Sequence, residues 1–295
     1  MSGRRKRRES RLVALAYLAP AILFVGAFTF WPFVQMIWVS FHSWSLISPP
    51  KPIGLNNFIK AWGDRQFWIS LGYTLKYTAL ITPILMIGGY LIALLTAENT
   101  SLKRAVRAIV FVPVVIGLGA SSLLWYWLFS TDAGLVNRLL LDLGIIGQRV
   151  IWLGVDEDVS TWAIIVSITW KVIGFGMLLF VAAIQSIPKE LNEATMVDGA
   201  GYWQRTALIT VPLTLRTVLL VTLISMIGSL LAFDQFYIMT AGQPQNSTAT
   251  SVFYVYLNSF PYLKLGYGAA LSLILAAIVL VFTLLQMTLT RGSAG

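Results

Sequence analysis

The sequence has no cysteine and a single histidine, His42, among its 295 residues. Disulfide bonds and thiolate metal sites are therefore excluded, and so are zinc sites of the HExxH type, which need two histidines. The GxxxxGK[ST] motif of phosphate-binding loops is also missing, so ATP binding of that kind is not expected. No nucleophile, base and orienting residue form a catalytic set. These absences argue against an enzyme, and we interpret His42 as structural.

Charged residues are scarce as well. They make up 11% of the chain, whereas 57% of the residues are apolar and the mean hydropathy is +0.77. A soluble domain carries about a quarter charged residues, so this composition predicts an integral membrane protein. Because a lipid-facing backbone must satisfy its own hydrogen bonds, and because the apolar runs are uninterrupted, we expect helical spans rather than a β-barrel.

Six windows carry little or no charge and are long enough to cross a membrane as helices of ~20 residues. The first has 28 uncharged residues, too many for the ~7–15-residue core of a cleavable signal peptide, so we expect it to stay as an anchor. The predicted fold class is all-α. We expect one transmembrane domain over residues 12–290, a basic segment 1–11 and a tail 291–295. The six windows are Leu12–Val39, Tyr77–Ala97, Ala108–Thr131, Val159–Pro188, Thr217–Phe233 and Leu265–Thr290.

The basic residues are distributed unevenly along the chain. Six of the 21 fall within the first eleven positions. Twelve lie on the amino-terminal side of the predicted spans, against six on the opposite side. Because cytoplasmic loops carry the excess of Lys and Arg, we predict a multi-pass protein of the cell membrane with both termini in the cytoplasm. This topology explains the net charge of +9 better than a nucleic-acid partner does.

Residues 188–212 form a polar segment between the fourth and fifth predicted spans. Pro188 suits the first turn of a helix. We expect that helix to end after Val197, because Asp198-Gly199 supplies the left-handed geometry of a tight turn. A second short helix is predicted over Tyr202–Ile209. Judged by its composition alone, such a segment is most often an ordinary solvated loop.

The order of residues in this segment resembles the EAA loop of ABC importer permeases. The motif positions are Glu193-Ala194, Asp198-Gly199-Ala200, Ile209 and Pro212, with departures at Thr195, Thr206 and Val211. The resemblance implies the type I permease fold and a loop that couples the permease to ATPase subunits. The residues to which it gives the coupling role are Glu190, Glu193, Ala194, Asp198, Gly199 and Ala200.

Other stretches resemble the carbohydrate-importing branch of this family, of the maltose and glycerol-phosphate type. They are Trp170-Lys171, residues 185–191, residues 233–240 with Gly242 and Pro244, residues 18–24 and residues 56–58. The last two resemble the first of two paired permeases. The resemblance implies import of a sugar or sugar derivative and no cofactor bound by this chain. The implied partners are a second permease, two ATPase subunits that hold ATP and magnesium, an extracytoplasmic solute-binding protein and membrane lipid.

Two ionisable residues are predicted to lie at membrane depth: Lys171, well inside its window, and Asp234, directly after the window that ends at Phe233. A charge at membrane depth usually faces a cavity or a partner, which makes both candidates for a substrate path. The alternative is that they reach an interface or form a structural pair. The resemblance to maltose-type permeases adds six neutral residues in the spans on either side of the EAA loop to the predicted path. They are Val172, Phe175, Gly228, Ser229, Ala232 and Phe233.

Three other functions stay open at this point. The EAA loop is shared by permeases for polyamines, phosphate or peptides, although a phosphate path should need more basic residues within the spans. A secondary transporter driven by an ion gradient often carries inverted repeats, and the sequence has none that we can find. A membrane-embedded enzyme is disfavoured because no catalytic set converges.

Overall fold

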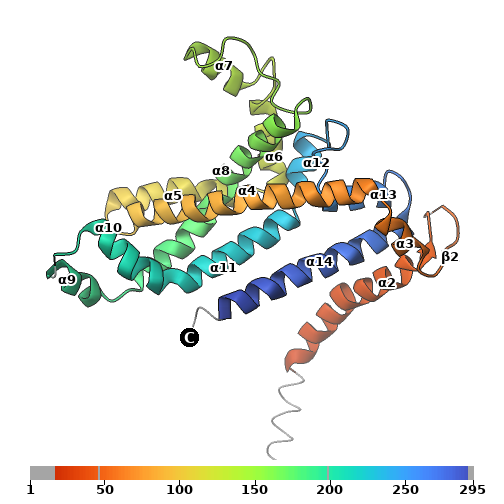
Figure 1. The fold of residues 1–295 in the computed structure, drawn as a ribbon, viewed down its shortest axis with the longest axis horizontal. Coiled ribbons are helices and arrows are strands. Elements are labelled where there is room, and N and C mark those ends of the chain that lie inside the picture. Colours follow the sequence, from red (N-terminus) through yellow and green to blue (C-terminus); the bar gives the residue numbers. More distant parts are fainter. Residues whose placement is uncertain (1–16, 46, 198, 292–295) are drawn as a thin grey trace, which may run out of the picture. The chain divides into compact units, whose positions relative to one another are not determined.

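The computed structural model describes residues 17–45, 47–197 and 199–291 and is mostly helical (Figure 1). It divides into two compact units, one of residues 1–64 and 255–274 and one of residues 65–254 and 275–295. The short elements of the first unit are η1 (Gly26–Phe30), α2 (Trp31–Ser40), the strands β1 (His42–Ser43) and β2 (Lys51–Pro52), and α3 (Asn56–Trp62). The remaining elements are α4 (Arg65–Thr96), α5 (Ser101–Val115), α6 (Leu118–Leu128), α7 (Leu135–Asp142), α8 (Glu157–Gln185), α9 (Lys189–Val197), α10 (Tyr202–Arg205), η2 (Thr206–Thr210), α11 (Val211–Leu230), α12 (Asp234–Met239), α13 (Ser251–Ser259) and α14 (Leu265–Arg291).

Within the described residues, five helices are long and apolar enough to cross a membrane. A sixth span results if α5 and α6 count as one, although they are bent by 100° at Ile116-Gly117. The all-α prediction with six transmembrane segments is therefore confirmed, with its third span broken. The five unbroken segments are Tyr17–Ser40, Arg65–Thr96, Glu157–Gln185, Tyr202–Leu230 and Leu265–Gln286.

Helix α4 begins twelve residues before the predicted window. The window started only after Lys76, because that residue carries a charge. In the structure Lys76 lies on the helix surface and forms ion pairs with Glu157 at 3.0 Å and with Asp158 at 2.7 Å. Counting charges along the sequence underestimates the length of a helix when a charged residue near its end forms ion pairs with acidic residues of a neighbouring helix.

Two stretches of π-helix interrupt the long helices. They are Gly26–Phe30 and Thr206–Thr210, and each lies two residues before a proline, Pro32 and Pro212. A proline has no N–H and its ring clashes with the preceding turn, and a locally wider turn accommodates both effects. The second short helix, predicted over Tyr202–Ile209, therefore does not end before Pro212 but continues into α11.

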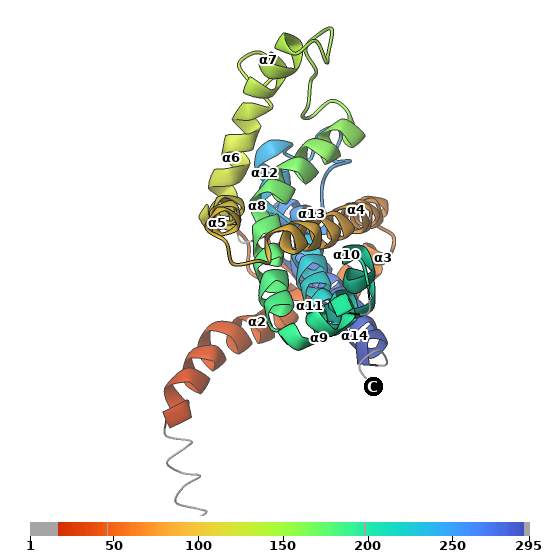
Figure 2. The same ribbon diagram turned by 90° about the vertical axis from the view of Figure 1, so that its left-hand side faces the viewer.

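The larger unit is built around α4 and α8. Tyr77 and Ile81 of α4 pack with Ile164 of α8 and Phe236 of α12 in a buried cluster. The Tyr77 ring meets Phe236 edge-on, with 4.9 Å between the ring centroids. Helix α5 also packs on α8, and Gly174 makes this approach possible, since a Cβ atom there would lie 2.4 Å from the Val110 carbonyl oxygen. Figure 2 shows α8 crossing between α5 on one side and α4 and α11 on the other.

In the smaller unit, one buried asparagine connects helix α3 to the β1 region. The Asn57 Nδ2 atom donates to the carbonyl oxygens of Ser40 at 2.8 Å and His42 at 3.0 Å. The His42 Nδ1 atom lies 2.7 Å from the Trp38 carbonyl oxygen, and its ring packs 4.0 Å from the Trp38 ring. These contacts fit the structural role predicted for His42.

Candidate functional site

The polar segment after α8 forms the hairpin of α9 and α10 (Figure 1). Helix α9 covers Lys189–Val197, so it begins directly after Pro188 and ends at the residue that the sequence predicted. Gly199 adopts φ +78°, its N–H bonds the Met196 carbonyl, and the Ala200 N–H bonds the Thr195 carbonyl. This pair of bonds is a Schellman motif, which satisfies carbonyls at the end of a helix and favours glycine. The predicted left-handed glycine turn is confirmed.

The candidate coupling residues lie along this hairpin. Glu190 and Glu193 are exposed on α9, and Gly199 and Ala200 form the turn that follows. Ala194 lies within α9. Asp198, the remaining candidate, lies outside the described residues. Large apolar side chains of the same hairpin are also exposed: Leu191 at 44%, Met196 at 59% and Trp203 at 69%.

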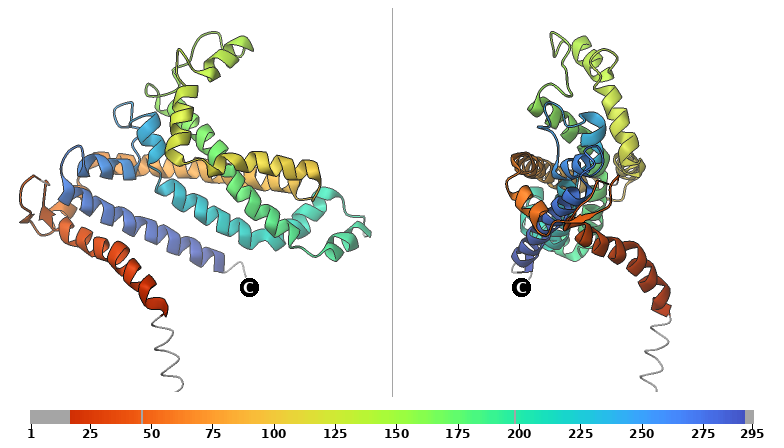
Figure 3. Two further views of the ribbon diagram at one scale, coloured as in Figure 1. Left: turned by 180° about the vertical axis from the view of Figure 1, so that it is seen from behind. Right: turned by 90° about the vertical axis from the view of Figure 1, so that its right-hand side faces the viewer.

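One contact joins the end of α8 to the residue after α4, and a second joins the hairpin itself to α4. The Gln185 side chain, in the last turn of α8, donates to the Ala97 carbonyl at 2.7 Å. The Tyr202 hydroxyl, in α10, lies 3.5 Å from the Leu94 carbonyl. Tyr90 lies one turn before Leu94 in α4. Its hydroxyl is 2.7 Å from the Thr214 hydroxyl and connects α4 with α11. The hairpin is thus continuous with α8 and α11 along the chain and bonded to α4 across it (Figure 3).

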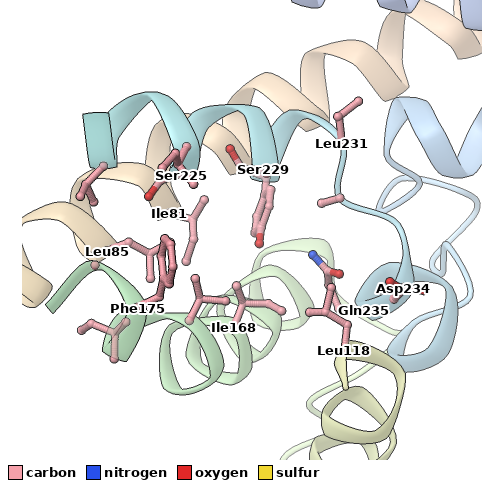
Figure 4. Close-up of a pocket in the computed structure, with 18 of the residues that line it drawn as sticks. Ile81, Leu85, Leu118, Ile168, Phe175, Ser225, Ser229, Leu231, Asp234 and Gln235 are labelled. Carbon is pink, nitrogen blue, oxygen red and sulfur yellow. The ribbon is translucent and has the colours of Figure 1, made fainter. Parts of the chain in front are cut away.

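A cavity of about 240 Å³ lies further along the same helices, between α4, α8, α11 and the start of α12. Figure 4 shows Phe175 toward one end of it and Gln235 and Asp234 toward the other. Seven of the eight predicted path residues line it: Val172, Phe175, Gly228, Ser229, Ala232, Phe233 and Asp234. The structure therefore brings together residues from both sides of the hairpin, and their part in transport stays a prediction.

Lys171 is the predicted path residue that the cavity lining does not include. Its side chain is 7% exposed, and Nζ donates to the Val114 carbonyl oxygen at 2.8 Å, at the break between α5 and α6. The two charges predicted to lie at membrane depth therefore have different surroundings. Lys171 contacts the backbone of a broken helix, while Asp234 faces the cavity.

Sequence reasoning missed three polar residues of the lining, namely Tyr77, Ser225 and Gln235. The Tyr77 side chain is hydrogen-bonded to Gln235. The Ser229 hydroxyl donates to the Met226 carbonyl at 2.9 Å, so its oxygen is available to a ligand only as a hydrogen-bond acceptor. Gln235 directly follows Asp234 and could have been found from that neighbour. Tyr77 is the first residue of its charge-free window, and no sequence pattern distinguishes it.

Comparison with known proteins places this arrangement in a family. Residues 86–293 match the family model of binding-protein-dependent transport system inner membrane components. The chain belongs to this family. Relatives that it resembles include the sulfoquinovosyl glycerol transport system permease protein SmoG of Agrobacterium fabrum, 32% identical over 95% of this chain and 91% of the relative. Another is the lactose transport system permease protein LacF of Rhizobium radiobacter, 32% identical over 93% of each.

A solved structure extends the similarity to the whole fold. It is a bacterial ABC transporter involved in the import of the acidic polysaccharide alginate, and it matches with a TM-score of 0.85 at 25% identity. The match covers 98% of this chain and 99% of the other. The predictions of an ABC importer permease and of a multi-pass membrane protein are confirmed. The family is one of transport permeases.

Proposed function

We propose that this chain carries a sugar into the cytoplasm as one of two permease subunits, driven by ATP hydrolysis in partner subunits that dock on the α9–α10 hairpin. The observation that carries the proposal is the connection of the cavity to the hairpin. Helices α8 and α11 supply opposite walls of the cavity and both end at this hairpin. A force applied to the hairpin therefore acts on two walls of the cavity together.

The surface chemistry of the hairpin supports docking of a protein. Leu191, Met196 and Trp203 are exposed beside Glu190 and Glu193. Exposed large apolar side chains on a segment that also carries charges are typical of protein interaction sites. Trp is among the residues that contribute most to binding energy at such sites. In the predicted topology the hairpin faces the cytoplasm, where ATPase subunits would meet it.

The continuity of the helices supports a rigid transfer of motion. Tyr202–Leu230 runs as one helical span of 29 residues from the hairpin to the cavity. The Tyr90–Thr214 hydrogen bond would make α4 follow α11. Packed helices move as rigid bodies because their interiors are close to crystal density. Tilting α8 and α11 together would open the cavity to one side of the membrane and then to the other.

The sugar assignment is supported by the named relatives and by the lining. Phe175 and Phe233 offer apolar surface for the C–H face of a sugar ring, and Ser229, Gln235 and Asp234 offer polar atoms for its hydroxyls. An extracytoplasmic solute-binding protein would deliver the sugar to the outer end of this path. The second permease would supply the facing wall.

A strain that lacks the chain tests the cargo. Growth should be lost on one or a few sugars, and uptake of the sugar so identified is then measured with variants supplied in trans. We expect Glu193→Lys and Gly199→Asp to reach the membrane at wild-type levels and to abolish uptake. Asp142→Lys, at an exposed position of α7, is the matched control and should leave uptake unchanged. Growth lost only on a polyamine, phosphate or a peptide would overturn the sugar assignment, and wild-type uptake in both hairpin variants would overturn the coupling role.

A further inference from the structure

The lining of the cavity is uneven in charge. Of the 19 described residues that form it, Asp234 is the one with an ionisable acid or base group other than the Tyr77 hydroxyl. Lysine and arginine are missing from this described lining. Lys171 directly precedes the lining residue Val172 in the sequence. Its ammonium group does not line the cavity and donates to the Val114 carbonyl oxygen.

We propose that the cavity admits uncharged sugars and that Asp234 is the specificity-determining residue that excludes anionic ones. The inference rests on the proposed function and names the substrate class for that site. A carboxylate on the cargo would meet the Asp234 carboxylate on this wall, with no lysine or arginine among the described lining residues of this chain. In a low-dielectric site such like-charge contacts are strongly unfavourable, and repulsion of this kind is how proteins reject related ligands.

The other polar groups of the lining suit a neutral polyol. The Tyr77 and Ser225 hydroxyls can both donate and accept hydrogen bonds, and the Gln235 amide does the same through two different atoms. The Ser229 oxygen can accept, since its hydrogen is donated to the Met226 carbonyl. The Asp234 carboxylate accepts only, so it pairs with sugar hydroxyls, which can donate. Gln235 and Asp234 lie toward one end of the space, Phe175 and Ser225 lie toward the other, and Ser229 lies between them (Figure 4). The cavity therefore matches the two kinds of surface that an uncharged sugar ring presents.

The absence of cysteine from the chain allows a direct test that does not require the cargo to be known. Ser229→Cys places one thiol of this chain in the lining, and Ser225→Cys places it at a second position in case the first variant fails to assemble. The complete importer in native membranes is treated with methanethiosulfonates that bear either an ethylsulfonate or an ethyltrimethylammonium group. The thiolate attacks the reagent, a disulfide forms and methanesulfinate leaves. Mass spectrometry of this chain gives the rate of each reaction.

We expect the cationic reagent to react faster than the anionic one by at least about tenfold, after division by the ratio measured for a small free thiol. Asp234→Asn should bring the corrected ratio close to one. Asp142→Asn removes an exposed acid from α7 instead, and should leave the ratio as it was. Equal rates with both reagents, or a ratio that Asp234→Asn does not change, would overturn the inference and leave sugar import standing.

The growth and uptake experiment separates the two proposals further. A cargo identified as a neutral sugar agrees with both. A cargo identified as a sugar acid or sugar phosphate would overturn the charge selection alone. Faster reaction with the cationic reagent, together with growth lost only on a polyamine, would overturn the proposed function. It would also overturn the inference that the substrate is a neutral sugar. Thiols at both positions that neither reagent modifies would overturn the cavity as a water-accessible path.

Discussion

Lys171 donates a hydrogen bond of 2.8 Å from Nζ to the carbonyl oxygen of Val114. Val114 is in the last turn of α5, where carbonyls have no partner within their own helix. The chain is extended at Ile116 and Gly117, so the helix cannot continue and supply one. A buried ammonium from α8 thus satisfies a carbonyl at the break of a membrane span, and a cation at a helix carboxyl end is also favoured by the helix dipole.

We predict that Lys171→Met destabilises the protein. Methionine keeps an unbranched apolar side chain of similar length, so the change removes mainly the charged donor and leaves the partly buried Val114 carbonyl without this partner. The expected loss is about 1–3 kcal/mol in the free energy of unfolding. Thermal unfolding of the purified protein in detergent measures it as a lower midpoint. Lys103→Met removes a lysine whose partner, Glu98, is exposed, and should change the midpoint much less. An equal midpoint for Lys171→Met and wild type would show that the bond contributes no net stability.

Gly174 gives a second prediction for the same helix contact. A Cβ atom at this position would lie 2.4 Å from the Val110 carbonyl oxygen and 2.9 Å from the Phe111 Cα. Both are backbone atoms, so α5 must move away from α8 to accommodate alanine. We expect Gly174→Ala to cost about 1–3 kcal/mol of stability or more. Thermal unfolding again provides the measurement.

Gly72→Ala is the matched control, because Gly72 lies within α4 with nothing within 4 Å of its added Cβ atom. There alanine should stabilise by up to about 1 kcal/mol through its better helix propensity. The two substitutions are chemically the same and are expected to have opposite signs. If Gly174→Ala were as stable as Gly72→Ala, the close approach of α5 and α8 would be wrong.

The parts of this molecule that could be predicted are those with local causes. The bounds of α9 follow from Pro188 at its start and Gly199 after its end, and both signals act within a few residues. The cavity residues on α8 and α11 were found through their resemblance to a known family, since apolar spans carry little periodic information. The break at Ile116-Gly117 was missed, because a charge-free window does not distinguish a straight helix from a bent one. The role of Lys171 depends on a carbonyl 57 positions away in the chain, and no local pattern reports such a contact.

The turn after α9 gives a third prediction. Gly199 has φ +78° and open space where a Cβ atom would stand, so substitution there acts through backbone strain rather than through a clash. Gly199→Ala should cost about 1–2 kcal/mol locally, because an L-residue with a Cβ atom disfavours this conformation. Gly199→Asn should cost less, since asparagine enters the left-handed region more readily. Hydrogen exchange at the amides of Gly199 and Ala200 in the purified chain measures the difference.

Gly201→Ala serves as the control for the turn. Gly201 has φ −66°, and the nearest atom to its added Cβ would be the Gln204 Oε1 atom at 3.7 Å, an ordinary contact. Exchange at Gly199 and Ala200 should therefore stay as in wild type. Faster exchange in Gly199→Asn than in Gly199→Ala would contradict the proposed origin of the strain.

Asn137, in α7, is the centre of a hydrogen-bond network in the segment before α8. It is 2% exposed, and its Nδ2 atom donates to the carbonyls of Thr131 at 3.2 Å and Val150 at 2.9 Å. Its Oδ1 atom accepts from the Val150 N–H at 3.1 Å and from the Trp152 indole N–H at 2.9 Å. One buried amide thus satisfies four groups and holds the two ends of the loop around α7 together.

We predict that Asn137→Leu releases this loop, since four polar groups lose their partner at a cost of about 1–3 kcal/mol for each that stays buried. Limited proteolysis of residues 131–152 should become much faster, and hydrogen exchange at Val150 should rise with it. Asn99→Leu, at an exposed position, is the control and should leave both unchanged. Equal proteolysis of Asn137→Leu and wild type would mean that the network does not hold the loop.

Asn137→Asp tests the two bonds that the Asn137 Nδ2 atom donates separately from the two that its Oδ1 atom accepts. A carboxylate can still accept from Val150 and Trp152, and these two bonds favour its charged form. Burial and the facing carbonyl oxygens of Thr131 and Val150 disfavour that charge, and we expect them to prevail and to raise the pKa of the new carboxyl in the folded loop. The protonated form can donate to one of those carbonyls. A raised pKa in the folded state means that stability is present at low pH and is lost as the pH rises through that pKa. Hydrogen exchange at Val150 in this variant, corrected for the intrinsic pH dependence of exchange, should therefore be slower in acid than at neutral pH, whereas the corrected exchange of wild type should show no such step. A flat profile in the variant would mean that the two donor bonds of Asn137 do not stabilise the loop.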